Sequence, residues 1–286
     1  MASMKDIKRR KESIQSTGQI TKAMKLVATV KLQKARGKAE NAKPYFDAMY
    51  ETVSTMLART SGIEHKYLKP GDTNKKAIIV ITANRGLAGG YNSGITKLVA
   101  GSKIPQEDMV IYAVGTKGRD YFTRRNYEIA ADYSEVINEP LYSDAMDIGS
   151  RVLKDFEDGK IGEIYLAYTS FKNTVVHTPE LVKLLPVNPD EHIVSEDNDE
   201  KDIMTYEPEE DEALDIIIPK YINSLIYGAL MESVASENGA RMTAMDNATS
   251  NAEEMISDLA LMYNRARQSS ITQELTEIIA GANAIS

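Results

Sequence analysis

The sequence of 286 residues contains no cysteine, which excludes a disulfide framework and any chemistry based on a thiolate. It has no run of 18 apolar residues, so no segment is expected to cross a bilayer as a helix. The first thirteen residues, MASMKDIKRRKES, lack the apolar core of a secretory signal peptide. These absences predict a soluble chain that faces the cytosol.

Motifs that would mark a catalytic or cofactor site are also missing. The three histidines, His65, His177 and His192, have no partners at metal-ligand spacing. No serine lies in a GxSxG context, and no pair of carboxylates stands out from the surface acids. We therefore expect no catalytic residue, no metal and no cofactor in this chain.

One glycine-rich turn, NRGLAGGYNS at residues 84–93, keeps a nucleotide-binding alternative open. Such a turn after a strand can hold a phosphate at a helix N-terminus. However, Gly86, Gly89 and Gly90 are not spaced as GxGxxG, and no Lys-Ser or Lys-Thr pair follows as in a P-loop. A tight strand-to-helix connection is the favoured interpretation. The alternative, a nucleotide-dependent enzyme, predicts saturable nucleotide binding by the isolated chain.

Proline is almost absent from both ends of the chain, which predicts two long helices. None of the 67 residues after Pro219 is proline, and apolar or small residues recur there at helical spacing. A helix from about Ala213 to Ala280 would be roughly 100 Å long, far longer than the helices of compact domains. Residues 4–57 contain only Pro44, with a similar three-to-four spacing of apolar residues.

Both predicted helices include a stretch with few large apolar side chains, at about Thr21–Ala42 and Ser233–Ala252. Small side chains allow two helices to approach closely. We interpret the two stretches as the contact between the helices of an antiparallel coiled coil. The pattern leaves the register open.

The middle of the chain alternates strands and helices, which predicts an α/β sheet. A helix is expected at Tyr142–Glu157, and an edge strand interrupted at Pro179 is expected over Val175–Pro186. The other predicted strands are Ala77–Thr82, Met109–Val114, Glu128–Tyr133 and Glu163–Phe171.

Four segments are thus predicted: an N-terminal coiled-coil helix (1–58), an α/β domain (75–190), an acidic linker (191–212) and a C-terminal coiled-coil helix (213–286). Residues 190–212 hold twelve Asp or Glu and one lysine, Lys201. Such a run is typical of a solvated connection, which we favour over a regulatory element.

Charge is distributed unevenly along the chain. Residues 1–38 hold eleven Lys or Arg against two acidic residues, a balance of +9, whereas the whole chain carries −8. The asymmetry indicates an acidic protein partner, a nucleic acid or a solvated helix face. Aromatic residues are absent from residues 1–44, which weakens the case for single-stranded nucleic acid.

The C-terminal helix is expected to end in an apolar face. A chain end normally frays, and an exposed apolar face promotes aggregation. A second copy of the chain could cover such a tip, but a sleeve made by other subunits suits it better. The face consists of Ile271, Leu275, Ile278, Ile279, Ala282 and Ile285.

Four motifs resemble the γ subunit of F-type ATP synthases. They cover both predicted helices and the glycine-rich turn, and the segment ITQELTEIIAGA at residues 271–282 is highly specific to that family. The short start without a targeting peptide resembles bacterial members. The motifs are TKAMKLVA (21–28), NRGLAGGYNS (84–93), ENGARMTAMDNATS (237–250) and YNRARQSSITQELTEIIAGA (263–282).

The resemblance implies an α/β fold in which a Rossmann-like domain, without a nucleotide of its own, is inserted between two helices of an antiparallel coiled coil. This shaft would stand inside a ring of three α and three β subunits. Its foot would hold the ε subunit and rest on the membrane ring of c subunits. Proton flow would turn the shaft, and the chain would be a non-catalytic coupler at the cytoplasmic face of a bacterial membrane, peripheral to it.

The resemblance also implies which residues contact partners. Tyr206 and Glu207 match the foot contact with the c ring and ε, although Met204 stands where some relatives have an aromatic residue. The apolar tip would turn inside a nonpolar collar. Contacts with β subunits would come from Lys8, Arg9, Lys22, Lys25 and Lys31 on the basic helix and from Arg267 and Gln268 near the tip.

A coiled-coil scaffold that binds nucleic acid is the second alternative. It predicts binding to DNA or RNA that collapses steeply with added salt. The shaft hypothesis predicts no nucleic acid partner and one copy of this chain for every three β subunits. Co-purification followed by mass measurement separates these possibilities.

Overall fold

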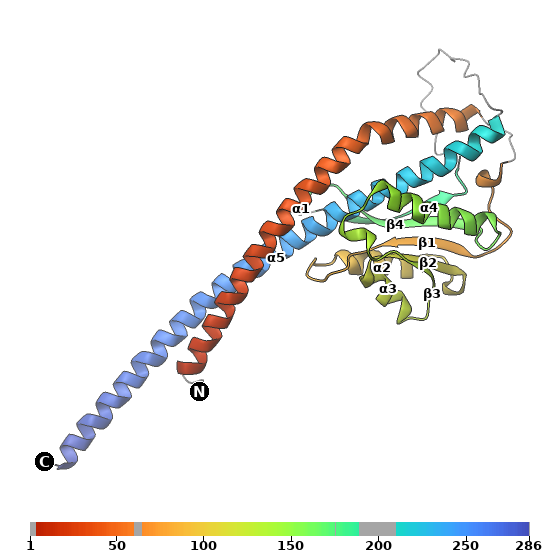
Figure 1. Cartoon of the computed structure of the whole chain (residues 1–286). Coiled ribbons are helices and arrows are strands. Elements are labelled where there is room, and N and C mark those ends of the chain that lie inside the picture. The colour runs from red at the N-terminus through yellow and green to blue at the C-terminus, as the bar shows by residue number, and fades with distance from the viewer. Residues whose placement is uncertain (1–3, 60–64, 175, 189–209, 286) are drawn as a thin grey trace. The chain divides into compact units, whose positions relative to one another are not determined.

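The computed structural model describes residues 4–59, 65–174, 176–188 and 210–285. They belong to two compact units (Figure 1). The helical unit combines Met1–Ala28 with Arg241–Ser286, and the sheet unit spans Thr29–Ala240. The two long helices, α1 (Met4–Arg59) and α5 (Glu210–Ile285), each have residues in both units. The division into four segments stays a prediction.

Both long helices predicted from the scarcity of proline are confirmed. Helix α1 has 56 residues and α5 has 76, and each extends slightly beyond its predicted limits. Pro44 and Pro219 both lie inside their helices. Among the described residues, no helix is apolar enough over a sufficient length to cross a membrane.

The sheet unit contains a five-stranded sheet in the order β3-β2-β1-β4-β5. The first four strands pair in parallel, and β5 pairs antiparallel with β4. This order matches one half of a Rossmann fold, with an antiparallel edge strand added. All four strands predicted before Phe171 are confirmed to within one residue. The bounds are β1 Lys76–Ile81, β2 Met109–Val114, β3 Glu128–Asp132, β4 Glu163–Phe171 and β5 His177–Leu185.

Helices cover both faces of the sheet. In β1, Ala77, Ile79 and Ile81 point into a core shared with α4 and with the parts of α1 and α5 in this unit. Ile78 and Val80 point into the opposite core, with α2 and α3. Both faces are apolar because a parallel strand is buried on both sides. The bounds are α2 Tyr91–Ala100, α3 Thr116–Thr123 and α4 Tyr142–Glu157, with short 3₁₀ turns at Lys66–Leu68, Gln106–Asp108 and Val136–Asn138.

The expected interruption of the edge strand at Pro179 is wrong. Strand β5 continues through Pro179, which lies opposite Thr169 of β4. The backbone N–H and C=O of Thr169 both bond to side chains of α5, on the side away from β5. This position of the ladder therefore requires no N–H from its partner, so a proline is tolerated.

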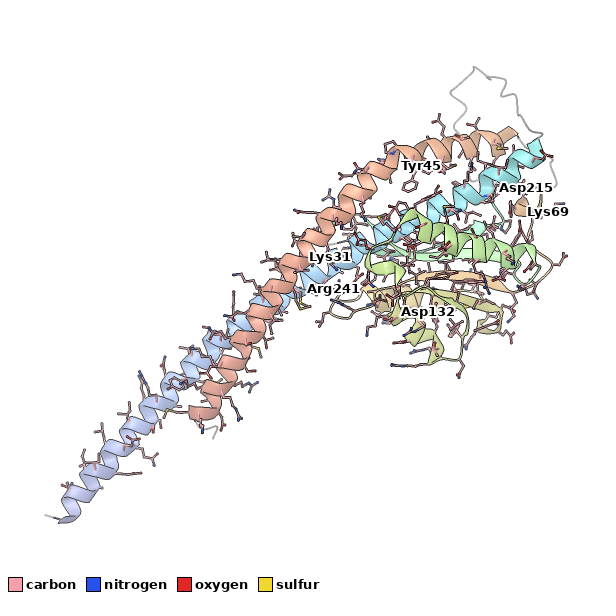
Figure 2. The ribbon with its side chains drawn as sticks, in the orientation of Figure 1. Lys31, Tyr45, Lys69, Asp132, Asp215 and Arg241 are labelled. Atoms are coloured by element: carbon pink, nitrogen blue, oxygen red, sulfur yellow. The ribbon has the colours of Figure 1, made fainter. Side chains whose placement is uncertain are left out.

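Polar side chains attach the start of α5 to the end of α4. The ammonium of Lys66 lies 2.9 Å from the carboxylate of Glu157 and 3.0 Å from that of Asp215, which is labelled in Figure 2. The Nε2 atom of buried His65 lies 3.2 Å from Asp215. The two acids and Lys66 are each more than 40% exposed. These ion pairs therefore hold the ends of α4 and α5 in place more than they add to the free energy of unfolding.

A buried carboxylate joins α4 to β2. Asp155 of α4 accepts hydrogen bonds from Tyr112 at 2.8 Å, from Arg151 at 2.9 Å and from Lys160 at 2.8 Å. Burial alone would raise the pKa of this carboxyl. The hydrogen bonds from Lys160, Arg151 and Tyr112 outweigh burial and lower the pKa to about 2.

This pKa predicts a loss of stability in acid. The folded-state pKa of Asp155 lies below its ordinary value of 3.8, so its stabilisation is present above about pH 4 and is lost as the pH falls towards 2. The difference corresponds to about 2 kcal/mol. In urea unfolding of the chain, Asp155→Asn should have a lower free energy of unfolding than wild type at pH 5. The difference between the two free energies should be smaller at pH 2. Exposed Asp147→Asn is the control. A gap independent of pH would contradict the assignment.

Candidate partner-contact surfaces

Within the helical unit, α1 and α5 run antiparallel in close contact. The Oγ1 atoms of Thr21 and Thr249 are 2.8 Å apart. A Cβ at Gly18 would lie 3.3 Å from the Cβ of Ala252, and Lys25 pairs with Asp246 at 2.5 Å. Residue numbers rise on one helix as they fall on the other, which defines the register that the sequence left open. Small residues permit this approach, as the pattern predicted.

The five basic candidates on α1 differ in their availability. Lys8, Arg9, Lys22 and Lys31 are exposed, and Arg9 forms only a loose pair with Asp6 at 3.7 Å. Lys31 is labelled in Figure 2. Lys25 is half-buried, and its ammonium already pairs with Asp246. Four of the five candidates are thus exposed, while Lys25 also pairs with α5.

The end of α5 presents its side chains to solvent. Arg267 and Gln268 are exposed, and no ion pair is found for Arg267 within the described part of the chain. Every residue from 271 to 283 is exposed. The large apolar side chains there are Ile271 (50% exposed), Leu275 (54%), Ile278 (67%) and Ile279 (60%). Ile285 is the last residue of the helix.

The two remaining candidates belong to the predicted foot contact. Tyr206 and Glu207 lie outside the described residues, as do His192 and most of the acidic linker. The proposed contact at the foot stays a prediction.

The glycine-rich turn uses its polar groups within the chain. The backbone N–H of Ala83 donates to the side-chain oxygen of Asn92 at 2.9 Å. The Asn84 side chain accepts from the N–H of Thr116 at 2.9 Å and donates to the carbonyl of Ser134 at 2.7 Å. These bonds join the ends of β1, β2 and β3 and support the interpretation of the turn as a tight connection.

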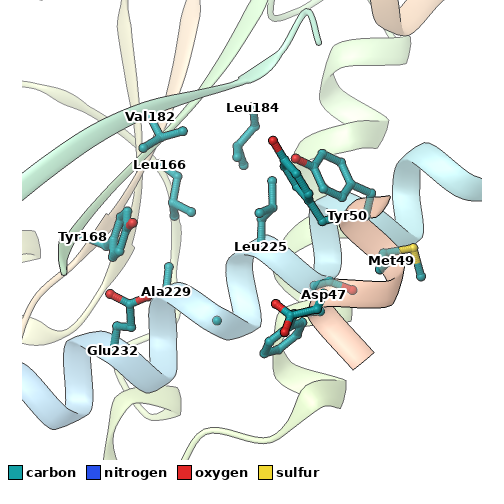
Figure 3. Close-up of a pocket in the computed structure, with 14 residues that line it drawn as sticks. Asp47, Met49, Tyr50, Leu166, Tyr168, Val182, Leu184, Leu225, Ala229 and Glu232 are labelled. Atoms are coloured by element: carbon teal, nitrogen blue, oxygen red, sulfur yellow. The ribbon is translucent and has the colours of Figure 1, made fainter. Parts of the chain in front are cut away.

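The sheet unit also contains a groove of about 300 Å³ between α1, α5 and strands β4 and β5 (Figure 3). Its walls are mainly apolar, with Leu166, Val182, Leu184 and Leu225 among the lining residues. None of the residues that line it is basic, and two, Asp47 and Glu232, are acidic. The groove therefore disfavours a phosphate ligand, which needs cationic or N–H partners.

A polar contact between α5 and β4 is not predicted by the sequence pattern. The run of small residues predicts that Ser233 and Ser236 face the N-terminal helix, but the structure gives them a different neighbour. Both are fully buried and hydrogen-bond to the backbone of Thr169 in β4. Glu232, on the same helix, bonds to the next alternate residue of β4, Phe171. The three-residue spacing of the two serines is the sequence signal for this contact.

Comparison with known proteins gives consistent matches over the whole chain. The profile of the ATP synthase family matches residues 3–285. An ATP synthase gamma chain of Lachnoclostridium phytofermentans is 69% identical over 100% of both chains. A chain of Acetobacterium woodii described as "ATP synthase gamma chain, sodium ion specific" is 42% identical, covering 99% of this chain and 98% of the relative.

Solved structures resemble the fold as well. A chain of the Tetrahymena thermophila mitochondrial ATP synthase, from its central stalk and c ring, has a TM-score of 0.61 and 26% identity over 80% of this chain and 99% of its own. A chain of the Euglena gracilis mitochondrial ATP synthase has a TM-score of 0.68 over 99% and 94%, at 18% identity. This second match bears on the fold alone.

Proposed function

Because the chain belongs to the ATP synthase γ chain family, we propose that it is the central rotor shaft of an F-type ATP synthase. The observation that carries the proposal is the antiparallel helix pair of the helical unit, whose longer partner ends in an exposed apolar tip. Such a tip requires a cover, and a ring of foreign subunits around the helix pair would supply one.

The proposed mechanism is mechanical coupling. Rotation of the c ring would turn the sheet unit and the helix pair together, and the asymmetric surface of the shaft would change the state of each catalytic β subunit in turn. The chain would be non-catalytic. Exposed Lys8, Arg9, Lys22 and Lys31 suit contacts with acidic β segments, because opposite charges steer and orient partners without requiring deep burial.

The experiment that tests this function is co-expression with α and β subunits, followed by native mass measurement. We expect one copy of this chain in a complex with three α and three β subunits. Recovery of the chain alone would overturn the proposal. Binding of DNA or RNA that falls steeply with salt, or saturable nucleotide binding by the isolated chain, would favour one of the two alternatives.

We further propose that the complex lies at the cytoplasmic face of a bacterial membrane, attached through ε and the c ring, and that it is driven by protons. Sodium is the competing ion, since the Acetobacterium woodii relative is described as sodium specific. ATP-driven pumping by vesicles separates the two ions. A proton-driven complex pumps without added sodium, and a protonophore abolishes the proton gradient that it builds. Pumping that requires sodium would overturn the ion assignment without affecting the shaft.

A further inference from the structure

The end of β4 extends beyond its parallel neighbour β1. The ladder between the two strands ends at Val80 opposite Ala167, whereas β4 continues to Phe171. On its other side, β5 remains paired as far as Phe171. The backbone groups of β4 that face the β1 side therefore have no strand partner after Ala167, although Thr169 is only 1% exposed.

Three side chains of α5 take the place of the missing strand. The N–H of Thr169 donates to the hydroxyl of Ser233 at 3.4 Å, and the hydroxyl of Ser236 donates to the carbonyl of Thr169 at 3.1 Å. The N–H of Phe171 donates to the carboxylate of Glu232 at 3.1 Å. Thr169 and Phe171 are alternate residues, so these backbone groups all point to the same side of the strand.

A glycine allows the helix to come this close. One turn after Ser236, a Cβ at Gly239 would lie 2.9 Å from the imidazole of His177 and 3.4 Å from the ring of Phe171. The first distance is shorter than real Cβ contacts, so a side chain at this position would require the imidazole of His177 or the helix itself to shift. At 3.6 residues per turn, positions 232, 233, 236 and 239 fall within about 120° of the helix circumference, so Gly239 and the three polar side chains lie on one side of α5.

The hydrogen bonds at this contact fix the orientation of α5 more strictly than apolar packing would. Burial of apolar surface is non-directional, so a helix could rotate about its axis on an apolar surface with little loss. Hydrogen bonds weaken steeply when misaligned, and a buried backbone group that loses its partner is costly. Glu232, whose carboxylate is visible at the edge of the groove in Figure 3, together with Ser233 and Ser236 therefore fixes both the rotation and the axial position of α5 against β4.

We propose that Glu232, Ser233 and Ser236 are positioning residues for torque transfer, which lock α5 to the end of β4 so that sheet and helix turn as one body. The inference rests on the proposed rotor function. A helix that slips on the sheet would allow hydrolysis of ATP without matching movement of ions. The locking residues should therefore affect the ratio of the two activities more than either subunit assembly or hydrolysis.

The test uses the assembled ATP synthase in membrane vesicles, with ATP hydrolysis and ATP-driven ion pumping measured on the same preparation. For Ser233→Ala/Ser236→Ala we expect pumping per ATP to fall by roughly three- to tenfold, the range of one or two lost hydrogen bonds. Ser257→Ala, an exposed serine on the same helix, is the control and should match wild type. A double variant that assembles and pumps as wild type overturns the inference.

Glu232 keeps the proposal testable if the buried serine variant fails to fold, because Glu232 is only half-buried. Glu232→Gln retains an acceptor for the N–H of Phe171 and should keep most of the pumping, whereas Glu232→Leu should lose it. Equal ratios of ion pumping to ATP hydrolysis for Glu232→Leu, Glu232→Gln and wild type would overturn the inference. Failure of wild type itself to assemble with α and β would instead overturn the proposed function.

Discussion

Replacing Gly115 with alanine is expected to destabilise the sheet unit strongly. Gly115 connects β2 to α3 with φ of 100°, a conformation that residues with a Cβ rarely adopt. A Cβ here would lie 2.0 Å from the carbonyl oxygen of Thr82. Thr82 cannot move away, because it is fully buried, its N–H donates to Val114 at 2.7 Å, and its hydroxyl oxygen accepts from the N–H of Gly118 at 2.8 Å.

Backbone strain and overlap together should cost at least about 3 kcal/mol, a large share of the stability of an ordinary domain. Urea unfolding followed by circular dichroism measures the change. The matched control is Gly86→Ala in the neighbouring turn, where a Cβ would meet nothing within 4 Å, and its effect should stay below about 0.5 kcal/mol. If Gly115→Ala were within about 1 kcal/mol of wild type, the close approach of Gly115 to Thr82 would be wrong.

Reversing the charge at Arg267 is expected to loosen the shaft from its ring. Arg267 is exposed on α5, so the substitution should leave the fold unchanged. If Arg267 pairs with a carboxylate of a β subunit, Arg267→Glu replaces an attraction by a repulsion. Loss of one partner of such a pair typically costs about 2–5 kcal/mol, so retention of this chain on the α and β subunits after a salt wash should fall at least about tenfold.

The control for this substitution changes the same charge at a position two residues away. Arg265 is also exposed, and it lies about 200° around the helix from Arg267. Arg265→Glu should have a much smaller effect if a defined contact is responsible. Equal losses for both variants would indicate a general electrostatic effect and remove the specific role of Arg267.

The sequence predicted the elements of this fold well because their signals are local. Scarcity of proline over residues 4–57 and 220–286 suffices to predict the two long helices. Short apolar runs bounded by turn residues, such as Met109–Val114, suffice for the strands. The prediction of an interruption at Pro179 was wrong because the effect of a proline depends on whether its backbone nitrogen faces the partner strand. The register with that strand, which the sequence does not show, determines this.

Residue roles were harder to predict because they depend on register. The pair between Lys25 and Asp246 requires residues 221 positions apart to meet, and neither helix pattern specifies that alignment. Ser233 and Ser236 have the same size and spacing as small residues that face another helix, so the pattern could not reveal that they bond to a strand. The remaining candidates near the tip stay predictions, since their neighbours belong to other chains.

The burial along α5 has a consequence for amide hydrogen exchange. Most residues from Leu214 to Gly239 are buried, whereas residues 271–283 of the same helix are all exposed. Local opening requires little free energy where few tertiary contacts are lost. In the free chain, deuterium should therefore enter the last turns quickly and the first turns slowly. Slowing of exchange in the last turns alone would then report the moment at which other subunits close around them.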